Sequence, residues 1–375
     1  MKKLFFVLCL AFILPIVLTI ISCQNANAPE TAKPNASGSD VAKTNIGVTW
    51  TQRNLPAKAT WSAVTFGNGK FAAVSQWDDV STKGSQTGAV SSDGITWTSN
   101  KLPEAQWVSL AFGSSGFVAI AWGGGDENTS AAIALSSDGS TWKSGILPSS
   151  GANLNYWNDI AYNGKEYYAV VFSQPSNGRI AYSSGDCRVW TVEDKKGESF
   201  NSIVGCDPGK KEIMIFGNTT TFYCCDYTGV IPLSSKPPVN PSTHRVAYGD
   251  GTVVAIKDNK AACASLIEAY DSAKAYMKAG LAQTPYVIQT LSSIDLSWKT
   301  VTLPFSASCI TYGDGTFVVL GSNKAATSTD GGLTWTTRAL PVSANWSAAT
   351  FGNGTVVAVA YDAGGKKTST IVTSP

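Results

Sequence analysis

Short apolar runs separated by glycine-containing turns recur along most of this chain. Runs such as Phe71–Val74, Phe117–Ala121 and Phe317–Leu320 each follow an aromatic residue and a tight turn. Asn-Gly and Asp-Gly between apolar runs are strong hairpin signals, because both central residues accept a positive φ. The pattern therefore predicts β-hairpins throughout. The turn occurs, with variations, at Phe66–Gly69, Phe112–Gly116, Tyr162–Gly164, Cys206–Gly209, Tyr248–Gly251, Tyr312–Gly315 and Phe351–Gly354.

A second turn alternates with the first and ends in tryptophan. Ser328–Trp335 reads STDGGLTW, in which Asp can bond backbone N–H groups of its own turn and Gly accepts positive φ. Looser copies lie at Ser91–Trp97, Ser136–Trp142, Ser183–Trp190 and Ser292–Trp298. A period of roughly 40–50 residues is typical of propeller blades or of a solenoid. Each unit is expected to hold four strands, A to D, with the first turn between A and B and the second between C and D.

The two ends of the chain carry complementary halves of one unit. The last unit stops after Ser369–Thr373, a candidate strand C, whereas Gly47–Trp50 followed by Leu55-Pro56 matches the close of a unit without earlier strands. Sharing one blade between the termini closes a ring and removes free sheet edges. We therefore predict an all-β, seven-bladed β-propeller whose last blade is closed by strands from both termini. A linear solenoid, the alternative, would leave both halves unpaired.

The turn at Ser328–Trp335 resembles the Asp-box (BNR) repeat of the sialidase-like propeller superfamily. Ser328, Asp330, Gly332, Thr334 and Trp335 fill the repeat's defining positions, and the other copies depart from it. The resemblance covers about residues 46–375 and implies a propeller whose boxes are structural and lie on the face opposite the ligand site. Sialidases of this superfamily grip a carboxylate with three arginines. This chain has five arginines in all, of which only Arg179 and Arg245 are expected near that face, so sialidase activity is not expected.

The N-terminal segment has the pattern of an export signal. Met1-Lys2-Lys3 precedes the apolar stretch Leu4–Ile21, and Ser22-Cys23 then resembles a bacterial lipobox. Residues 1–22 are predicted to be a lipoprotein signal peptide that leaves Cys23 as the lipidated N-terminus. Residues 23–46, poor in large apolar side chains, are predicted to be a disordered tether. An uncleaved membrane anchor and an ordinary signal peptide are the alternatives.

The expected location is a bacterial membrane, reached through this lipid anchor. Gln24 after the cysteine favours, by resemblance to proteobacterial lipoproteins, the outer membrane, on its periplasmic side or at the cell surface. We expect the rest of the chain, residues 47–375, to form the propeller as a monomer. Charged residues make up only 14% of the chain and the formal net charge is +2, so nucleic acid is not an expected partner.

Cysteine and histidine usage bears on disulfides and metals. Six cysteines remain beyond Cys23, an even number that permits disulfides in an exported protein. Cys187 and Cys206 fall in turns on the same rim of adjoining units, and we predict that they form a disulfide. His244 is the only histidine and the chain has no CxxC pair, so no metal site is predicted. No cofactor is predicted either.

One stretch breaks the β pattern. Residues 260–285 are rich in Ala, Lys, Leu and Met, and Leu266, Tyr270 and Met277 recur at helical spacing, which predicts a helical insertion. One interpretation places it between strand B and a strand C at Tyr286–Leu291. In the other, Ala261–Ser265 is strand C and the helix lies on the opposite face.

The tryptophans provide the candidate binding site. Six of the twelve close box-type turns and are assigned to structure. The other six are expected on the opposite face, where the D–A and B–C connections meet around the central channel. An aromatic platform of this kind suits sugar rings or a partner protein. The predicted ligand-binding residues are Trp61, Trp107, Trp157 and Trp346 at the start of strand A, Trp77 and Trp122 after strand B, and the loop acids Asp78, Asp79 and Asp126.

Each candidate has a structural alternative. A tryptophan at the start of an inner strand can simply pack between blades, and a loop acid is often only solvated. We predict a non-catalytic binding or scaffolding module for a glycan or a protein. The alternatives are a divergent glycoside hydrolase of the same fold, which would use two carboxylates, and an assembly factor for a membrane complex.

Overall fold

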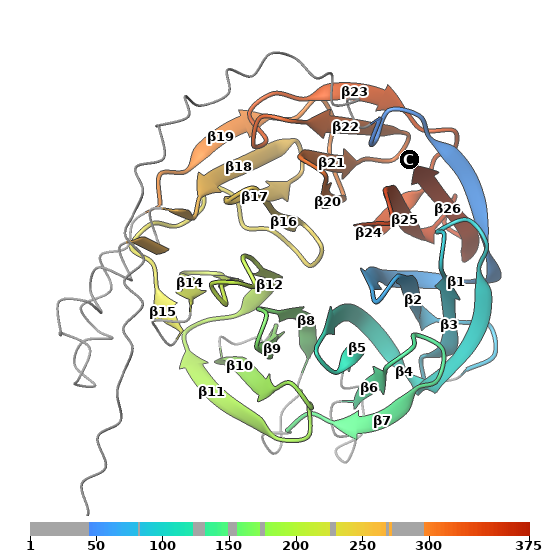
Figure 1. Ribbon diagram of the computed structural model, residues 1–375, viewed down its shortest axis with the longest axis horizontal. Coiled ribbons are helices and arrows are strands. Elements are labelled where there is room, and N and C mark those ends of the chain that lie inside the picture. The colour runs from blue at the N-terminus through green and yellow to red at the C-terminus, as the bar shows by residue number, and fades with distance from the viewer. Residues whose placement is uncertain are drawn as a thin grey trace, which may run out of the picture. The chain divides into compact units, whose positions relative to one another are not determined.

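The strands surround a central channel. The computed structural model describes residues 45–375 except 82, 123–131, 149–155, 173–176, 226–229, 268–269 and 272–295. Every regular element named in this part is a strand, and the sheets are antiparallel and arranged in a ring (Figure 1). Thr44–Pro375 forms one compact unit. Within the described ranges, no helix is long and apolar enough to cross a membrane.

Four of the sheets contain four strands each, and in each of them consecutive strands pair. The first is β8 (Trp157–Tyr162), β9 (Glu166–Val171), β10 (Asn177–Ser184) and β11 (Trp190–Lys196). The second is β12 (Phe200–Gly205), β13 (Ile213–Gly217), β14 (Thr221–Cys224) and β15 (Ile231–Pro232). The third is β16 (Val246–Gly249), β17 (Thr252–Lys257), β18 (Lys260–Ser265) and β19 (Lys299–Thr302). The fourth is β20 (Cys309–Gly313), β21 (Thr316–Leu320), β22 (Lys324–Ser328) and β23 (Thr336–Ala339).

The remaining ten strands form one continuous sheet. Its order is β24 (Asn345–Gly352), β25 (Thr355–Asp362), β26 (Thr368–Ser374), β1 (Thr51–Gly67), β2 (Lys70–Trp77), β3 (Ser85–Ser91), β4 (Thr98–Gly113), β5 (Gly116–Trp122), β6 (Ala132–Ser136) and β7 (Lys143–Ile146). The C-terminal strand β26 lies between β25 and β1, and Thr373 pairs with Thr51. The two ends of the chain therefore meet in one sheet, as the sequence predicts.

The sheet is continuous because β1 and β4 are long enough to serve two groups of strands. β1 pairs with β26 through Thr51–Ala59 and then with β2 through Thr60–Gly67. The sequence predicts that Leu55-Pro56 closes a strand, but β1 runs through it. Proline is accommodated because the ladder with β26 is interrupted between Asn54 and Ala59, where no backbone donor is required.

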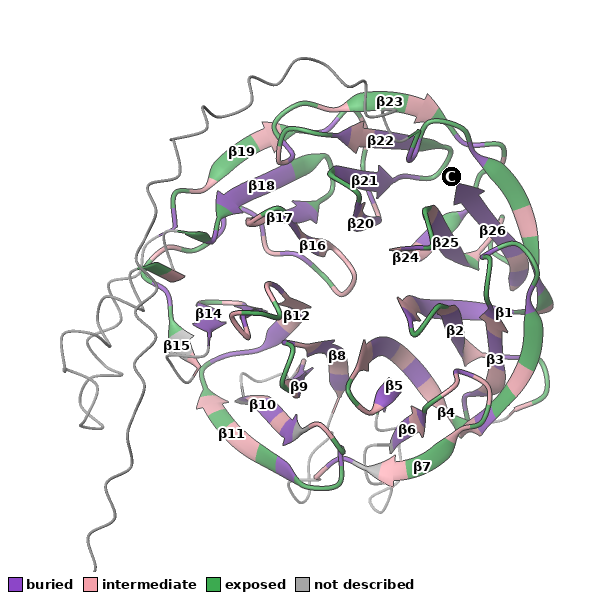
Figure 2. Cartoon of the chain, viewed as in Figure 1, coloured by how far each residue is buried: buried purple, intermediate pink, exposed green. Residues whose placement is uncertain are grey.

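The apolar core lies between neighbouring sheets rather than within one. Second strands such as β13 and β21 are buried throughout, whereas the outer strands β11, β19 and β23 are partly to largely exposed (Figure 2). The predicted aromatic-glycine turns connect the sheets. A Cβ added at Gly113 would lie 2.5 Å from the Tyr162 ring of the next sheet, and the same close approach joins Gly67 to Phe112 and Gly352 to Phe66. Only glycine leaves room for the neighbouring ring.

The predicted helical insertion at 260–285 needs correction. Lys260–Ser265 is strand β18, which pairs with β17 directly after a turn at Asp258-Asn259. The second interpretation of this stretch is therefore the better one. A single backbone bond from Tyr270 N to Leu266 O has helical spacing. Residues 272–295, including the alternative strand at Tyr286–Leu291, lie outside the described ranges.

Candidate functional site

Two of the predicted tryptophans end strands on the face that carries the D–A and B–C connections, here called the upper face. Trp77 ends β2 opposite Thr60, and Trp122 ends β5 opposite Gln106, on neighbouring sheet segments. Trp122 is 37% exposed and Trp77 is half-buried. Tyr156, which the sequence analysis did not identify, places its ring edge-on to Trp122 with centroids 5.7 Å apart. We call Trp77, Trp122 and Tyr156 the aromatic group.

The other four predicted tryptophans are packed inside. Trp61, Trp107 and Trp157 are 0% exposed and Trp346 is 2% exposed, so none presents a ring to a ligand in this structure. The indoles of Trp61, Trp107 and Trp346 donate to backbone oxygens, of Ala57, Pro103 and Ser322 respectively. Each of the four rings packs between two sheets, because it stands at the start of an inner strand. This agrees with the structural alternative given for these tryptophans in the sequence analysis.

The predicted loop acids differ from one another. Asp78 is buried, and its carboxylate accepts hydrogen bonds from the backbone N–H groups of Val80, Ser81 and Gln86 and from the hydroxyls of Ser85 and Thr87. Burial alone would raise the pKa of Asp78, but these hydrogen bonds lower it well below its usual value. With both oxygens occupied, Asp78 shapes the loop after Trp77 and is not available to a ligand.

Asp79 and Asp126 are the remaining predicted acids. Asp79 is exposed and accepts from Lys367 Nζ at 2.8 Å, which connects the loop after β2 to the loop before β26. The lysine also donates to the backbone oxygen of Asp78. Asp126 lies outside the described residues. Of the two predicted acids that the structure describes, only Asp79 is exposed.

A group of amides occupies another part of the upper face. The side-chain nitrogen of Asn201 donates to the Oδ1 atoms of Asn218 and Asn240 at 3.1 and 2.9 Å, and Asn158 donates to Asn201 O at 2.7 Å. All four side chains are partly exposed. Such a group offers further neutral donors and acceptors, which suit hydroxyl-rich or peptide ligands. The sequence analysis did not identify it, because its members come from separate segments of the chain.

The channel contains a cavity of about 270 Å³ that is lined in part by Asp159 and His244. Asp159 is 3% exposed and accepts from Ser109 Oγ at 2.7 Å and Ser202 Oγ at 3.0 Å, so it joins three adjacent inner strands. Burial raises its pKa, although His244 and the hydrogen bonds oppose that rise. His244 Nε2 lies 3.2 Å from Val108 O.

This polar channel residue was missed in the sequence, although a signal was present. Asp159 stands two residues after Trp157, and Ser109 stands in the same relation to Trp107. The structure shows that this position faces the channel. Both Asp159 oxygens accept hydrogen bonds from the protein, since the backbone N–H groups of Ile160 and Ile203 add to the two hydroxyls. The carboxylate therefore holds the channel wall together.

The box turns lie on the opposite face, and each is stabilised by hydrogen bonds between its own residues. Asp138 Oδ1 accepts from the N–H groups of Ser140 and Thr141, both at 2.8 Å, and these bonds lower the pKa of Asp138 to about 2. Asp330 is bound in the same way, and its pKa is also lowered to about 2 because these hydrogen bonds outweigh the loss of solvent around the carboxylate. Lys70 Nζ reaches the backbone oxygen of Asp138 from the preceding turn. These boxes stabilise turns and contacts between turns.

The predicted pair Cys187 and Cys206 are both buried free thiols. Cys187 packs with Trp157 and Trp190, whereas Cys206 belongs to a different core cluster with Met214 and Cys225. The structure thus does not bring the predicted disulfide together, because the two turns face different sheet interfaces. Burial raises the pKa of the Cys187 thiol to about 12. No group of three or more potential metal ligands occurs among the described residues.

The comparisons with known proteins identify the fold class as a β-propeller. The β-propeller domain of Cps50 (Swd1) from Myceliophteria thermophila matches with a TM-score of 0.56 at 8% identity, over 87% of this chain and 99% of that one. A structure of YCF48 bound to D1 peptide matches with a TM-score of 0.55 at 12% identity, over 86% and 94%. BBS1N in complex with ARL6DN gives 0.51 at 12% identity, over 86% and 94%. No family model and no curated protein sequence matches. At such identities the likeness shows the fold alone.

Proposed function

We propose that this chain is a lipid-anchored, exported, seven-bladed β-propeller that acts as a non-catalytic binding or scaffolding module. What supports a count of seven is that the long sheet can be divided where β1 and β4 change partners, into three groups of four strands beside the four separate sheets. The ligand, a glycan or a protein segment, binds on the upper face at the aromatic group.

The observation that carries this proposal is the exposed Trp122 beside Tyr156. A tryptophan with over a third of its surface in water, held edge-on by a second aromatic ring, is unusual in a chain whose other large indoles are mostly buried. Rigid aromatic rings bind at a low cost in conformational entropy and serve as anchors for sugars and for proteins. The amides of Asn201, Asn218 and Asn240 add hydrogen-bonding capacity on the same face.

The state of the buried carboxylates favours binding over catalysis. A glycoside hydrolase needs two carboxylates open to the substrate, whereas Asp78 and Asp159 are each occupied by hydrogen bonds from the protein. YCF48, a structural match, is a propeller bound to a peptide, and this supports keeping a protein segment beside a glycan as the candidate ligand. Anchoring by Cys23 rests on the lipobox pattern in the sequence.

The test is a binding screen of the full chain and its Trp122→Ala variant on glycan and peptide arrays. Leu333→Ala is the matched control, because Leu333 is 39% exposed but lies in a box turn on the opposite face. We expect Trp122→Ala to lose at least about tenfold in affinity, as for a central aromatic anchor, and Leu333→Ala to bind normally. Equal binding by all three proteins would refute the proposed face. Turnover of aryl glycosides would establish the hydrolase instead.

The anchor is tested separately by expressing Cys23→Ser. We expect the wild-type chain in the membrane fraction and the variant in the soluble exported fraction, because one acyl chain or more is lost with the thiol. Membrane association of Cys23→Ser equal to that of wild type would refute lipidation at this residue.

A further inference from the structure

The loop that follows Trp77 on the upper face carries an unusually exposed apolar side chain. Val80 is 90% exposed, whereas the other exposed large apolar side chains of the described residues are 37–74% exposed. One exposed apolar residue is by itself ordinary on a protein surface. Val80 differs because the loop that carries it is bound to the rest of the protein at several points.

The loop is bound on its inner side by the buried carboxylate of Asp78. The Oδ1 atom accepts from the backbone N–H groups of Val80 and Ser81 at 3.0 and 2.7 Å. The Oδ2 atom accepts from the Gln86 N–H at 2.8 Å and from the Ser85 hydroxyl at 3.1 Å. Hydrogen bonds to an ionised group are about twice as strong as those between neutral groups. Both ends of the loop are therefore fixed to one side chain.

Two neighbouring segments bind the loop from outside. Lys367, between β25 and β26, donates to Asp79 Oδ1 at 2.8 Å and to the backbone oxygen of Asp78. On the other side, the Lys83 N–H donates to Glu104 Oε1 of β4 at 3.0 Å. Loops are usually the more mobile parts of a fold. Because this loop is already ordered, a partner that binds it loses little free energy to ordering it.

Other apolar side chains reach the surface on the segments next to this loop. Trp77, half-buried, precedes it, and Tyr361, 42% exposed, stands next to the end of β25, where the loop with Lys367 begins. Trp122, 37% exposed, ends β5 on the next group of strands. Aromatic residues within a polar rim are typical of protein–protein interfaces. Since these side chains stand on successive segments, an extended peptide segment can contact them one after another.

The aliphatic character of Val80 favours a protein over a glycan as the partner. Aromatic rings such as Trp122 serve sugars and proteins alike, but valine has neither a flat ring nor a hydrogen-bonding group. A sugar hydroxyl placed against it would lose its water without gaining a partner, which costs free energy. An apolar side chain instead gains free energy when it leaves water. The partner that fits this loop is therefore a protein segment with apolar side chains.

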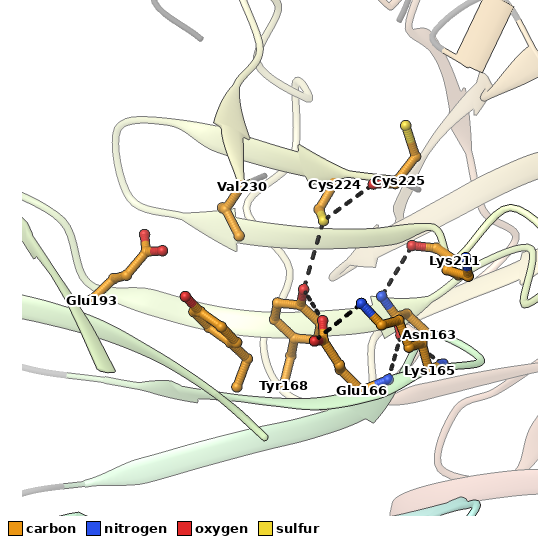
Figure 3. A pocket seen from close by; sticks show the side chains of 10 residues that line it. Asn163, Lys165, Glu166, Tyr168, Glu193, Lys211, Cys224, Cys225 and Val230 are labelled. Carbon is orange, nitrogen blue, oxygen red and sulfur yellow. Dashed lines mark hydrogen bonds and ion pairs between the residues drawn. The ribbon is translucent and has the colours of Figure 1, made fainter. Parts of the chain in front are cut away.

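The cavity of about 230 Å³ between the β8–β11 sheet and the β12–β15 sheet differs from this surface (Figure 3). Both glutamates that line it are in ion pairs, Glu166 with Lys165 at 3.6 Å and Glu193 with Lys195 at 2.8 Å. The Tyr168 hydroxyl also donates to Glu166, at 3.0 Å. A polar ligand would have to replace these contacts, whereas binding at the exposed loop requires no such exchange.

We propose that Val80, with Trp77 and Tyr361 beside it, binds an apolar side chain from an extended segment of a partner protein. The partner's side chain covers Val80 and the exposed parts of the two rings, and the ion pair of Asp79 with Lys367 stays at the polar rim. This inference rests on the binding function proposed for the upper face. It makes that function more specific, because it selects a protein segment over a glycan.

The experiment tests the full chain on an array of random linear peptides and on a glycan array, and then titrates the peptides that bind. We expect these peptides to be enriched in aliphatic and aromatic residues. Val80→Ser should bind them at least about tenfold more weakly, as truncation of a central anchor does. Val189→Ser is the matched control, because Val189 is 74% exposed but lies between β10 and β11 on the opposite face. Both valines are exposed, so unchanged unfolding temperatures are expected for both variants.

The outcomes separate this inference from the function on which it rests. Peptides that bind wild type and Val80→Ser equally would refute the contact at Val80, and so would an array on which no peptide binds. If the ligand found is a glycan whose binding depends on Trp122, the binding function of the upper face is supported and the protein partner is wrong. If no binding on either array depends on Trp122 or Val80, both proposals are wrong.

Discussion

Gly113→Ala is predicted to destabilise the ring where two sheets meet. The added Cβ would lie 2.5 Å from Cγ of Tyr162 and 2.6 Å from the hydroxyl oxygen of Tyr167. Carbon atoms in contact prefer about 3.5–4.0 Å, so the rings would have to retreat by about 1 Å. The backbone φ at Gly113 is not positive, so the effect comes from this crowding and not from backbone strain.

The two rings cannot retreat freely. They pack on each other with centroids 4.7 Å apart, and the Tyr167 hydroxyl donates to Gly116 O at 2.8 Å while its side chain is 0% exposed. Overpacking of a well-filled core costs about 1–3 kcal/mol of stability. We expect a cost in the upper half of this range, because Tyr167 is held by its hydrogen bond and cannot move aside. With an unfolding entropy of about 2.1 cal/mol/K per residue over about 330 residues, about 2.5 kcal/mol lowers Tm by about 3–4 °C.

Urea unfolding followed by tryptophan fluorescence measures the loss, with scanning calorimetry for Tm. Gly209→Ala is the control, because its added Cβ would meet only Asp207 Oδ1 at 3.2 Å; we expect a change within about 0.5 kcal/mol. In a Tyr162→Ala, Tyr167→Phe background the cost of Gly113→Ala should fall below about 1 kcal/mol. A Gly113→Ala protein as stable as wild type would refute the glycine-ring contact as a determinant of stability.

Three further predictions test other parts of the structure. Asp138 and Asp330 have lowered pKa values of about 2 in the folded state, so the stability they contribute is full above about pH 4 and is lost as the pH falls towards 2; unfolding of Asp138→Asn should depend less on pH there, and an unchanged pH dependence would contradict this. Trp61→Ala should cost about 3–5 kcal/mol as a core truncation, whereas Trp122→Ala should cost less than about 1 kcal/mol in the same urea titration; equal costs would show that the two indoles are equally buried. A chain ending before Thr368 lacks β26 and exposes the edges of β25 and β1, so limited proteolysis should cleave it far faster than the full chain, and equal resistance would argue against closure by this strand.

Much of the fold could be predicted from local turn chemistry. Aromatic-glycine turns such as Tyr312–Gly315 reveal hairpins because positive φ is required at their centres, and Asp314 and Gly315 do adopt it. The terminal pairing of β26 with β1 follows from counting strands. Lys260–Ser265 was harder to place, because a strand of alanines also fits the start of a helix.

The candidate site was less predictable, since exposure is decided by packing between sheets. Trp61 and Trp122 both adjoin strands near the channel, yet one is 0% and the other 37% exposed. Their sequence positions do not reveal which ring has a neighbouring sheet to cover it. The sequence does not show that the Asp78 carboxylate is occupied, because its backbone donors come from residues up to eight positions later in the chain.

Because strands β1 and β4 are continuous, one arc of the ring is a single hydrogen-bonded sheet, whereas the rest of the ring consists of separate sheets. Along this arc, from β24 to β7, hydrogen-bonded backbone passes from one group of strands to the next without an intervening loop. Trp77 and Trp122 stand on this arc, paired to β1 and β4 themselves. A molecule that docks there meets a surface already fixed before it arrives, and little of its binding energy is spent on ordering the receptor.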